Sequence, residues 1–581
     1  YDVSRSSQTA GTAFTIFADN AYLPQDIQAA LARTGTTSFR LARVDRDFGF
    51  SRVAARSDTW RVAGGFDAKL GGDWHLEGYA SHGANDYEVD TYNNPIYRRL
   101  FAAADAVVDP ATKRIVCRST LQGYDPGCVP VNLFGDGSVS AEARDYFMGT
   151  AVQVLKLRQD VASLTVRGSP LELPAGPLSI AAGFEYRREQ ARQTSDELSQ
   201  TVISNVGVRG LPTSFVGQRG SYFLSNPQPL RGSYDVREGF VEAELPLLKD
   251  SSVGKSLSLN GAARLIDYST VGSLWAWKAG AVYDPVEALR LRVTRSRDIR
   301  AANVSELFTG PVSIQGTVLY NNATTAFIGR RSGNPDLAPE RADTLTAGAV
   351  FKPPFLPRFN LSVDYYSIDL KGAIAQLTPQ QTIDQCNLGF QPACAQITNN
   401  GQLTLLIPTL NLSSIKSRGV DAELSYSAPL GEGNLRLRGL LSYLDKFETT
   451  LPGTPPIERA GDIGTSGTPR WGGTFSANYA HPSFDLFVQE RFIGSGKIDT
   501  TAPPGTFSNN HVGSVWYTDL TAKWNVSNAI TNGQFFITVK NLFDRQPPIV
   551  PTIPYGGYRS TNFSLYDVIG RYFTAGFQFK F

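Results

Sequence analysis

The chain has 581 residues, with 55 basic and 53 acidic side chains and a formal net charge of +2. This balance argues against nucleic acid as a partner, because binding nucleic acid requires a basic surface. No uninterrupted apolar run approaches 18 residues, which excludes transmembrane helices. A transmembrane β-barrel stays compatible, since its strands alternate apolar and polar residues. The 33 Phe, 24 Tyr and 54 Gly, with only 19% charged residues, favour one large barrel over several soluble domains.

The first 50 residues are the least regular part of the chain. It starts at Tyr1 with neither an initiator Met nor a signal peptide. The stretch from Leu23 to Ala32 is compatible with a short helix within an extracellular loop. Residues 38–50 form a doubtful strand, because counting backward from a periplasmic C-terminus gives this segment an awkward direction.

Strict alternation recurs through the rest of the chain and predicts strands with one apolar face. It is clearest at the end, where Phe573, Ala575, Phe577, Phe579 and Phe581 share one face. Lipid outside and water inside a closed barrel explain both faces at once. We therefore predict an all-β fold, a transmembrane antiparallel up-and-down β-barrel of about 17–18 strands that occupies residues 1–581. The same alternation is found at 241–245, 289–293, 420–426, 435–441 and 535–539.

Short and long connections alternate between the predicted strands, as they do in outer-membrane barrels. Aromatic residues sit beside the short turns, in positions typical of an interfacial girdle; these are Trp74, Tyr283, Phe484 and Trp524. The short turns are at 71–73, 284–286, 430–433 and 481–483. The long loops cover roughly 89–148, 196–233, 301–339, 375–413, 450–468, 497–510 and 549–570.

The four cysteines form two close pairs within predicted long loops, Cys117 with Cys128 and Cys386 with Cys394. This pattern predicts two disulfides in an oxidising compartment. The alternative is a four-thiolate metal site, but the CxxC-like spacing that such a site needs is missing. We expect no metal and no cofactor.

No sequence pattern of a hydrolase, a zinc protease or a phosphate-binding loop is present, so we expect no enzyme. Glu242 with Glu244, and Asp421 with Glu423, are adjacent on a predicted inner face. Acid/base catalysis at such pairs is conceivable, but a polar lumen wall balanced by arginines is the preferred interpretation. The loops instead offer aromatic and amide side chains suited to stacking on a bound solute: Tyr222, Phe223, Tyr320, Asn321, Asn322, Tyr555 and Tyr558.

Several segments in the second half together resemble the TonB-dependent outer-membrane receptors. RAANVSELF at 300–308 is similar to the family stretch R-A-P-x-x-x-E-L-F, with Ala302 where Pro is usual. GNPDLAPE at 333–340 matches the family signature G-N-P-x-L-x-P-E. Further similar segments are 417–423, Asn541-Leu542-Phe543-Asp544 with Pro547, and the closing segment from 566 to Phe581.

This resemblance implies a receptor in the outer membrane of a Gram-negative bacterium, held in outer-membrane lipid. It would bind a scarce, bulky solute at its extracellular loops and be driven by the TonB-ExbB-ExbD complex. An iron-siderophore is the usual cargo, and cobalamin or an oligosaccharide are others. The C-terminal Phe581 would be recognised by the barrel assembly machinery. The family has 22 strands and an N-terminal plug, so we expect this chain to be a barrel region without its plug, TonB box and first strands. The alternative is a complete passive diffusion porin of 18 strands.

Overall fold

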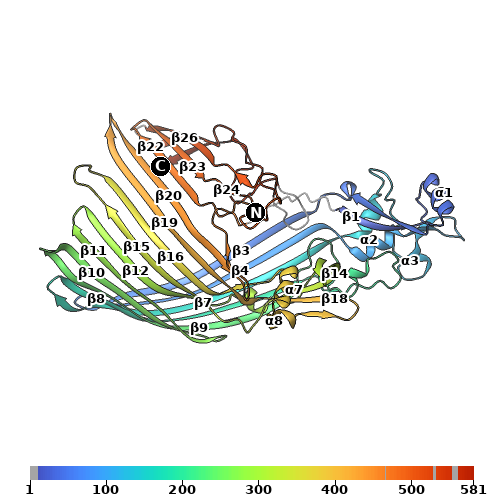
Figure 1. Cartoon of the computed structure of the whole chain (residues 1–581), viewed down its shortest axis with the longest axis horizontal. Coiled ribbons are helices and arrows are strands. Elements are labelled where there is room, and N and C mark those ends of the chain that lie inside the picture. Colours follow the sequence, from blue (N-terminus) through green and yellow to red (C-terminus); the bar gives the residue numbers. More distant parts are fainter. Residues whose placement is uncertain (1–10, 465, 528–531, 552–559, 581) are drawn as a thin grey trace.

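The computed structural model describes residues 11–464, 466–527, 532–551 and 560–580. Long antiparallel strands follow one another around a barrel wall in chain order (Figure 1). The wall strands are β3 (Arg52–Gly71), β4 (Trp74–Pro95), β7 (Met148–Leu173), β8 (Gly176–Ser195), β9 (Leu230–Ser251), β10 (Gly254–Tyr268), β11 (Gly272–Val286), β12 (Leu289–Arg300), β15 (Glu340–Phe351), β16 (Phe359–Ala375), β19 (Leu410–Leu430), β20 (Gly433–Thr450), β22 (Trp471–Ala480), β23 (Phe484–Ile493), β26 (Val515–Ser527), β27 (Asn532–Lys540) and β28 (Tyr572–Lys580).

No helix in these described ranges has the length and apolar character needed to span a membrane.

The wall confirms the predicted all-β barrel and its strand count. Seventeen long strands make up the described wall, and the two-residue strand β21 (Ile457–Glu458) adds a rung beside β20. Three of the four predicted short turns fall where expected, at 72–73, 431–432 and 481–483. The turn predicted at 284–286 is displaced, because β11 extends through Val286 and the chain reverses at residues 287–288.

The alternation of the sequence sets the two faces of the wall. Large apolar side chains such as Val241, Leu291, Val293, Phe573 and Phe577 are exposed on the outer face, where a soluble protein would bury them. Charged residues alternate with them and point to the lumen. An apolar outer wall around a polar lumen is the arrangement of a membrane-spanning barrel.

The doubtful segment 38–50 does form a strand, but not in the wall. The strand β2 (Ser38–Val44) pairs with β1 (Gly11–Phe17) in a separate two-stranded sheet, and η1 (Arg46–Phe48) follows it. The predicted helix is present as α1 (Gln25–Thr34) between these two strands. Its C-terminus is closed by Gly35 at φ 65°, a conformation that favours glycine.

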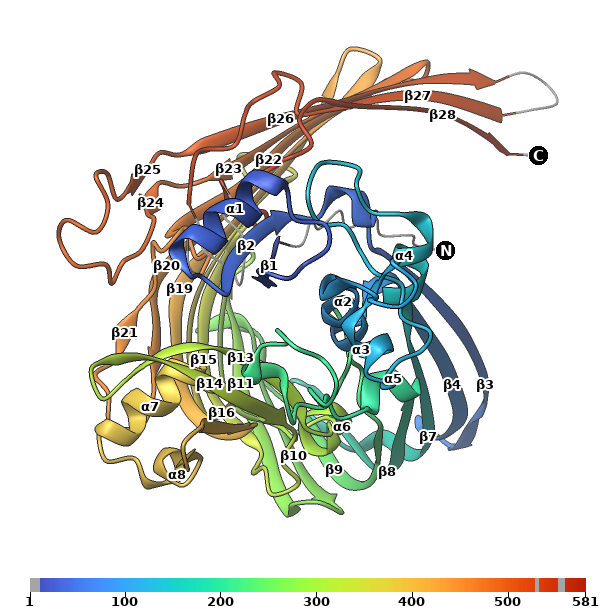
Figure 2. The same cartoon turned by 90° about the vertical axis from the view of Figure 1, so that its right-hand side faces the viewer.

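The remaining elements lie in the long loops at one end of the barrel; Figure 2 shows α2 and α3 over its opening, and α7, α8, β24 and β25 outside its rim. The loop helices are α2 (Tyr97–Ala104), α3 (Arg118–Leu121), α4 (Ala141–Phe147), α5 (Glu197–Gln200), η2 (Thr213–Phe215), α6 (Val304–Phe308), α7 (Pro379–Asn387) and α8 (Gln391–Cys394). The loop strands are β5 (Ala106–Val108), β6 (Ile115–Cys117), β13 (Val312–Tyr320), β14 (Ala323–Ser332), β17 (Ile397–Asn399), β18 (Leu403–Pro408), β24 (Gly496–Lys497) and β25 (His511–Val512).

Candidate functional site

The first loop cluster joins the N-terminal sheet to the loop between β4 and β7. Phe14 and Ile16 of β1 are 1% exposed and pack with Leu100 and Phe101 of α2 in a shared apolar core. The predicted disulfide between Cys117 and Cys128 is present, and both cysteines are part of this core. The N-terminal strands therefore belong to the loop end of the molecule.

An ionic network fixes these segments to the next loop. Arg209 Nη2 lies 2.7 Å from Asp19 Oδ1 and 2.7 Å from Asp105 Oδ1. Arg118 pairs with the same two carboxylates. Partial burial acts to raise the pKa of Asp19, but the hydrogen bonds and charges of Arg209 and Arg118 outweigh it and lower that pKa. The charged form of Asp19 is thus favoured in the folded loops.

The predicted solute contacts in this region are part of the loop packing. Tyr222 is 3% exposed, and its hydroxyl donates to the Thr150 carbonyl at 2.9 Å. Burial raises the pKa of Tyr222 to about 12, so this donor stays protonated. The ring of Phe223 meets Tyr97 edge-on at 5.5 Å between centroids. A role for Tyr222 and Phe223 in solute binding stays a prediction.

The second loop cluster contains the predicted residues Tyr320, Asn321 and Asn322. Tyr320 pairs with Ala323 across a two-residue hairpin between β13 and β14. Asn321 and Asn322 have φ values of 50° and 60°, which a tight hairpin turn requires and which Asn tolerates. These two amides are therefore exposed at the tip of a hairpin.

This cluster also contains the second predicted disulfide, Cys386 to Cys394, between α7 and α8. The strands β13, β14, β18 and β17 form one small sheet in that order, and β14 pairs with β18 in parallel. The sheet joins the loop after β12 to the loop after β16. Both disulfides therefore stiffen loop units and lie outside the wall.

A polar hollow of about 480 Å³ opens on the lumen face of the last strands. Arg491 on β23 lies 4.8 Å over the ring of Tyr517, and Lys540 ends β27 opposite Tyr572. Within the described part of the chain, neither Arg491 nor Lys540 forms a salt bridge, so both cations can meet an anionic or strongly polar solute. The lining residues are Gln489, Arg491, Asp519, Lys540, Asp567, Ile569, Gly570 and Tyr572.

Sequence reasoning did not single out this hollow, although alternation places its wall residues on the lumen face. Gln489 pairs with Asp519, and Arg491 pairs with Tyr517, across β23 and β26. Asp567 joins them from the loop before β28, which alternation alone cannot place.

The segment Asn541-Leu542-Phe543-Asp544 follows Lys540 and is hydrogen-bonded to two residues that line the hollow, Asp519 and Asp567. Asn541 is 1% exposed, and its side chain accepts from the Arg545 amide at 2.7 Å and donates to Asp567 Oδ2 at 3.0 Å. Its own amide donates to Asp519 Oδ1 at 2.9 Å. Asp544 accepts from the Arg571 amide at 2.9 Å. This motif therefore ties the entry of β28 to the rim of the hollow.

The motifs near 300 and 340 are likewise structural. Arg300 forms two hydrogen bonds to Glu340 and two to Glu306, all between 2.7 and 3.1 Å. Glu306 also completes a capping box with Asn303 at the start of α6. Asn334 donates to the Thr409 carbonyl at 3.0 Å, which links two loops.

The predicted inner carboxylates line the lumen. Glu242 and Glu244 lie beside a second hollow of about 320 Å³ with Arg167 and Lys278. Glu423 pairs with Arg438 at 2.8 Å. In the ranges that the structure describes, no three His, Cys, Asp or Glu side chains gather as a metal site. The other predicted positions, Tyr555, Tyr558 and Phe581, lie outside the described residues.

Comparison with known proteins assigns this barrel to a family. Residues 2–542 match the family model described as TonB-dependent receptor-like, β-barrel. The chain therefore belongs to the TonB-dependent receptor family, whose members are outer-membrane barrels of Gram-negative bacteria and serve as transport receptors. A search of curated proteins gives no match.

Solved structures agree on the fold. The ferric enterobactin receptor PfeA from Pseudomonas aeruginosa shares 14% identity at a TM-score of 0.50, over 92% of this chain and 70% of that chain. The siderophore receptor PirA from Acinetobacter baumannii shares 12% at 0.51, over 92% and 71%. The RagAB peptide importer shares 12% at 0.50, over 85% and 59%.

Proposed function

We propose that this chain forms the barrel of a TonB-dependent active-transport receptor in the outer membrane, and that its cargo is an iron-siderophore complex. The family match over residues 2–542 is the observation that carries the proposal. A barrel wide enough for such a solute would leak if it stayed open, so transport has to be gated and driven. By family resemblance, TonB with ExbB and ExbD supplies that drive.

The choice of an iron-siderophore is supported by the side chains that line the lumen hollow beside the last strands. Arg491 and Lys540 place two cations in the lumen hollow, and neither forms a salt bridge with another described residue. The carboxylates of Asp519 and Asp567 and the neutral polar groups of Gln489 and Tyr572 line the same hollow. Ferric chelates commonly present anionic and carbonyl oxygens, which such donors recognise. The exposed amides of Asn321 and Asn322 would meet the solute earlier, at the loop tips.

Uptake by cells that express the complete gene tests this proposal. Radiolabelled iron is supplied as a siderophore complex to a receptor-deficient strain, with and without functional TonB. We expect energised uptake only where TonB is present. Equal uptake in both strains would instead indicate a passive substrate-specific diffusion porin. Labelled cobalamin and an oligosaccharide are supplied in parallel, and uptake of either in place of iron would overturn the choice of cargo.

Binding measurements then locate the contact. Arg491→Gln and Lys540→Gln should each weaken the binding of the labelled iron-siderophore complex to whole cells about tenfold, because each removes a charged contact with the solute. Lys523→Gln is the matched control, since Lys523 is a cation of β26 on the same face but outside the hollow. Unchanged affinity in both hollow variants would exclude the hollow as the contact.

A further inference from the structure

The outer face of strands β12 to β22 carries an ordered series of cross-strand rows. The first row is aromatic: Tyr365 on β16 pairs with Val420, Val420 with Tyr443, and Tyr443 with Trp471. Tyr365 and Trp471 are exposed on the apolar face of the wall. Aromatic rows of this kind mark the level where hydrocarbon meets water.

The next row toward the loops contains three cations and no acid. Arg295 pairs with Leu345, which pairs with Ser367; Ser367 pairs with Arg418, and Arg418 with Lys446. Arg418 lies two residues before Val420 on β19, so its side chain is on the same face as the aromatic row. The cations thus lie directly above the aromatic row, at the level of lipid headgroups.

Two further rows extend this region, which we name the outer cationic patch. Five acids lie among seven cations, so the patch has a net charge of +2. Within the described residues, neither Arg295 nor Arg341 forms a salt bridge. The cations of the patch are Arg295, Arg297, Arg341, Lys371, Lys416, Arg418 and Lys446, and the acids are Asp343, Asp369, Asp445, Glu448 and Glu458.

The acids of the patch neutralise only some of its cations. Arg297 pairs with Asp343 at 2.9 Å, and Arg418 hydrogen-bonds Asp445 at 2.7 Å. Lys446 lies 3.1 Å from Glu448, which Lys416 approaches at 3.9 Å. Most of these side chains are a third or more exposed, so they stay accessible to an external anion.

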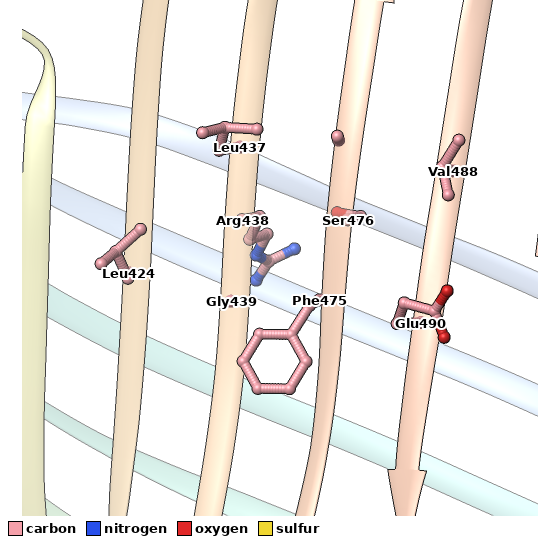
Figure 3. A pocket seen from close by; sticks show the side chains of 9 residues that line it. Leu424, Leu437, Arg438, Gly439, Phe475, Ser476, Val488 and Glu490 are labelled. Carbon is pink, nitrogen blue, oxygen red and sulfur yellow. The ribbon is translucent and has the colours of Figure 1, made fainter. Parts of the chain in front are cut away.

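An apolar groove of about 380 Å³ lies below the aromatic row on the same face. Figure 3 shows its walls on four neighbouring strands, with Leu424, Leu437, Phe475 and Val488 around the space over Gly439. The Phe475 ring lies 3.2 Å from the position of a Cβ at Gly439, so glycine leaves room for this groove. At its edge, Glu490 Oε1 accepts a hydrogen bond from Thr518 at 2.7 Å.

The groove lies at a depth that an acyl chain reaches. From Gly439 to Tyr443 is four residues of β20, which is about 13 Å along the strand and less along the membrane normal because barrel strands tilt. One leaflet of hydrocarbon is about 15 Å deep. A chain anchored at the aromatic row therefore ends within the groove.

We propose that this face is a binding site for one lipid that carries phosphate groups, with the phosphates on Arg295, Arg418 and Lys446 and an acyl chain in the groove. The proposal rests on the membrane location in the proposed function, but not on the cargo. From the loop end inward, the outer face carries cations, then aromatic side chains, then an apolar groove. This order matches the phosphates, the interfacial part and the acyl chain of a single phosphorylated lipid in the outer leaflet. A free anion would use the cations alone.

The test measures lipid bound to the purified full-length receptor by native mass spectrometry. The probe is a phosphorylated glycolipid of the outer leaflet added in detergent, and its dephosphorylated form is the comparison. We expect Arg295→Gln/Arg418→Gln/Lys446→Gln to reduce retention at least fivefold, and Gly439→Leu to reduce it by filling the groove. A control triple variant changes loop cations away from the wall, Arg33, Lys113 and Arg219, and should retain the lipid.

Three outcomes overturn the inference: equal retention by the patch variant, equal retention of the dephosphorylated lipid, or displacement by millimolar inorganic phosphate. Heat-modifiable gel mobility shows that each variant is folded. TonB-dependent uptake of the cargo is measured on the same variants. Loss of lipid from the patch variant with normal uptake supports the lipid site, whereas lipid retention by the unaltered receptor with failed uptake of the siderophore complex counts against the proposed cargo alone.

Discussion

Arg292 on β12 reaches Asp364 on β16 across the strand between them, with Arg292 Nε 2.8 Å from Asp364 Oδ1. Gly348 of β15 lies between the two in the same row of the lumen wall. A Cβ at Gly348 would lie 1.9 Å from Asp364 Oδ1. The missing side chain therefore allows two charges on non-adjacent strands, about 10 Å apart in the sheet, to pair.

Gly348→Ala should break this pair and destabilise the wall. Adding one carbon to a packed site costs about 1–3 kcal/mol, so the thermal midpoint in detergent should fall. Gly472→Ala is the matched control, because Gly472 lies on the lumen side of β22 with no heavy atom within 4 Å of the added carbon. Equal midpoints for the two variants would contradict this account of Gly348.

Removing the Cys117–Cys128 bridge should loosen one loop and leave the wall intact. The bridge closes a loop with a sequence separation of 11 residues, which corresponds to about 3 kcal/mol of local stabilisation. In Cys117→Ser/Cys128→Ser we expect faster proteolysis between 96 and 147, with the barrel still resistant to protease. Cleavage of the wall strands at the same rate would show that the bridge supports the barrel itself.

The Asp19 network should make the N-terminal sheet sensitive to acid. The pKa of Asp19 is lowered in the fold from its ordinary 3.8. Its contribution to stability is therefore complete above about pH 4 and is lost as the pH falls through the lowered folded value. Hydrogen exchange of residues 11–17 should be flat from pH 7 to 5 and, after correction for intrinsic rates, rise below 4.

Asp19→Asn should raise the exchange of residues 11–17 already at neutral pH and remove most of the acid dependence. Asp26→Asn serves as the control, because Asp26 is an exposed carboxylate on the neighbouring helix α1. An unchanged acid response in Asp19→Asn would assign that response to other groups.

Asn541→Ala should cost more stability than Asn541→Gly. Both changes remove the side-chain hydrogen bonds to Arg545 and Asp567, a loss of about 1–3 kcal/mol. Alanine also has to adopt the φ of 49° found at this position, which glycine adopts freely. Unfolding midpoints of the two variants give the difference, and a more stable alanine variant would contradict this role of the backbone.

Alternation predicted the wall well because each wall strand faces two different solvents. The row Leu289, Leu291 and Val293 is apolar for lipid, while Arg290 and Arg292 meet the lumen, so the sequence itself records both environments. It located the turn at 284–286 less well. There, β11 continues through Val286, and the chain reverses only at residues 287–288.

The loops could not be predicted in the same way. Arg209 meets Asp19 across 190 positions of sequence, and nothing local to either residue specifies that contact. The segment 38–50 shows the same limit, since its strand pattern is real but its partner is β1 and not a wall strand. Tyr222 is an aromatic loop residue of the kind that can stack on a solute, but only the structure shows that its side chain is buried.

The parallel pairing of β14 with β18 has a consequence for the order of assembly. Phe327 to Ser332 align with Leu403 to Pro408, and the hairpin of β15 and β16 lies between the two partners in the chain. The two segments can meet only once both have emerged on the same side of the bilayer, after β15 and β16 have been inserted. The loop sheet must therefore form late, and the onset of its amide protection would time the completion of that part of the wall.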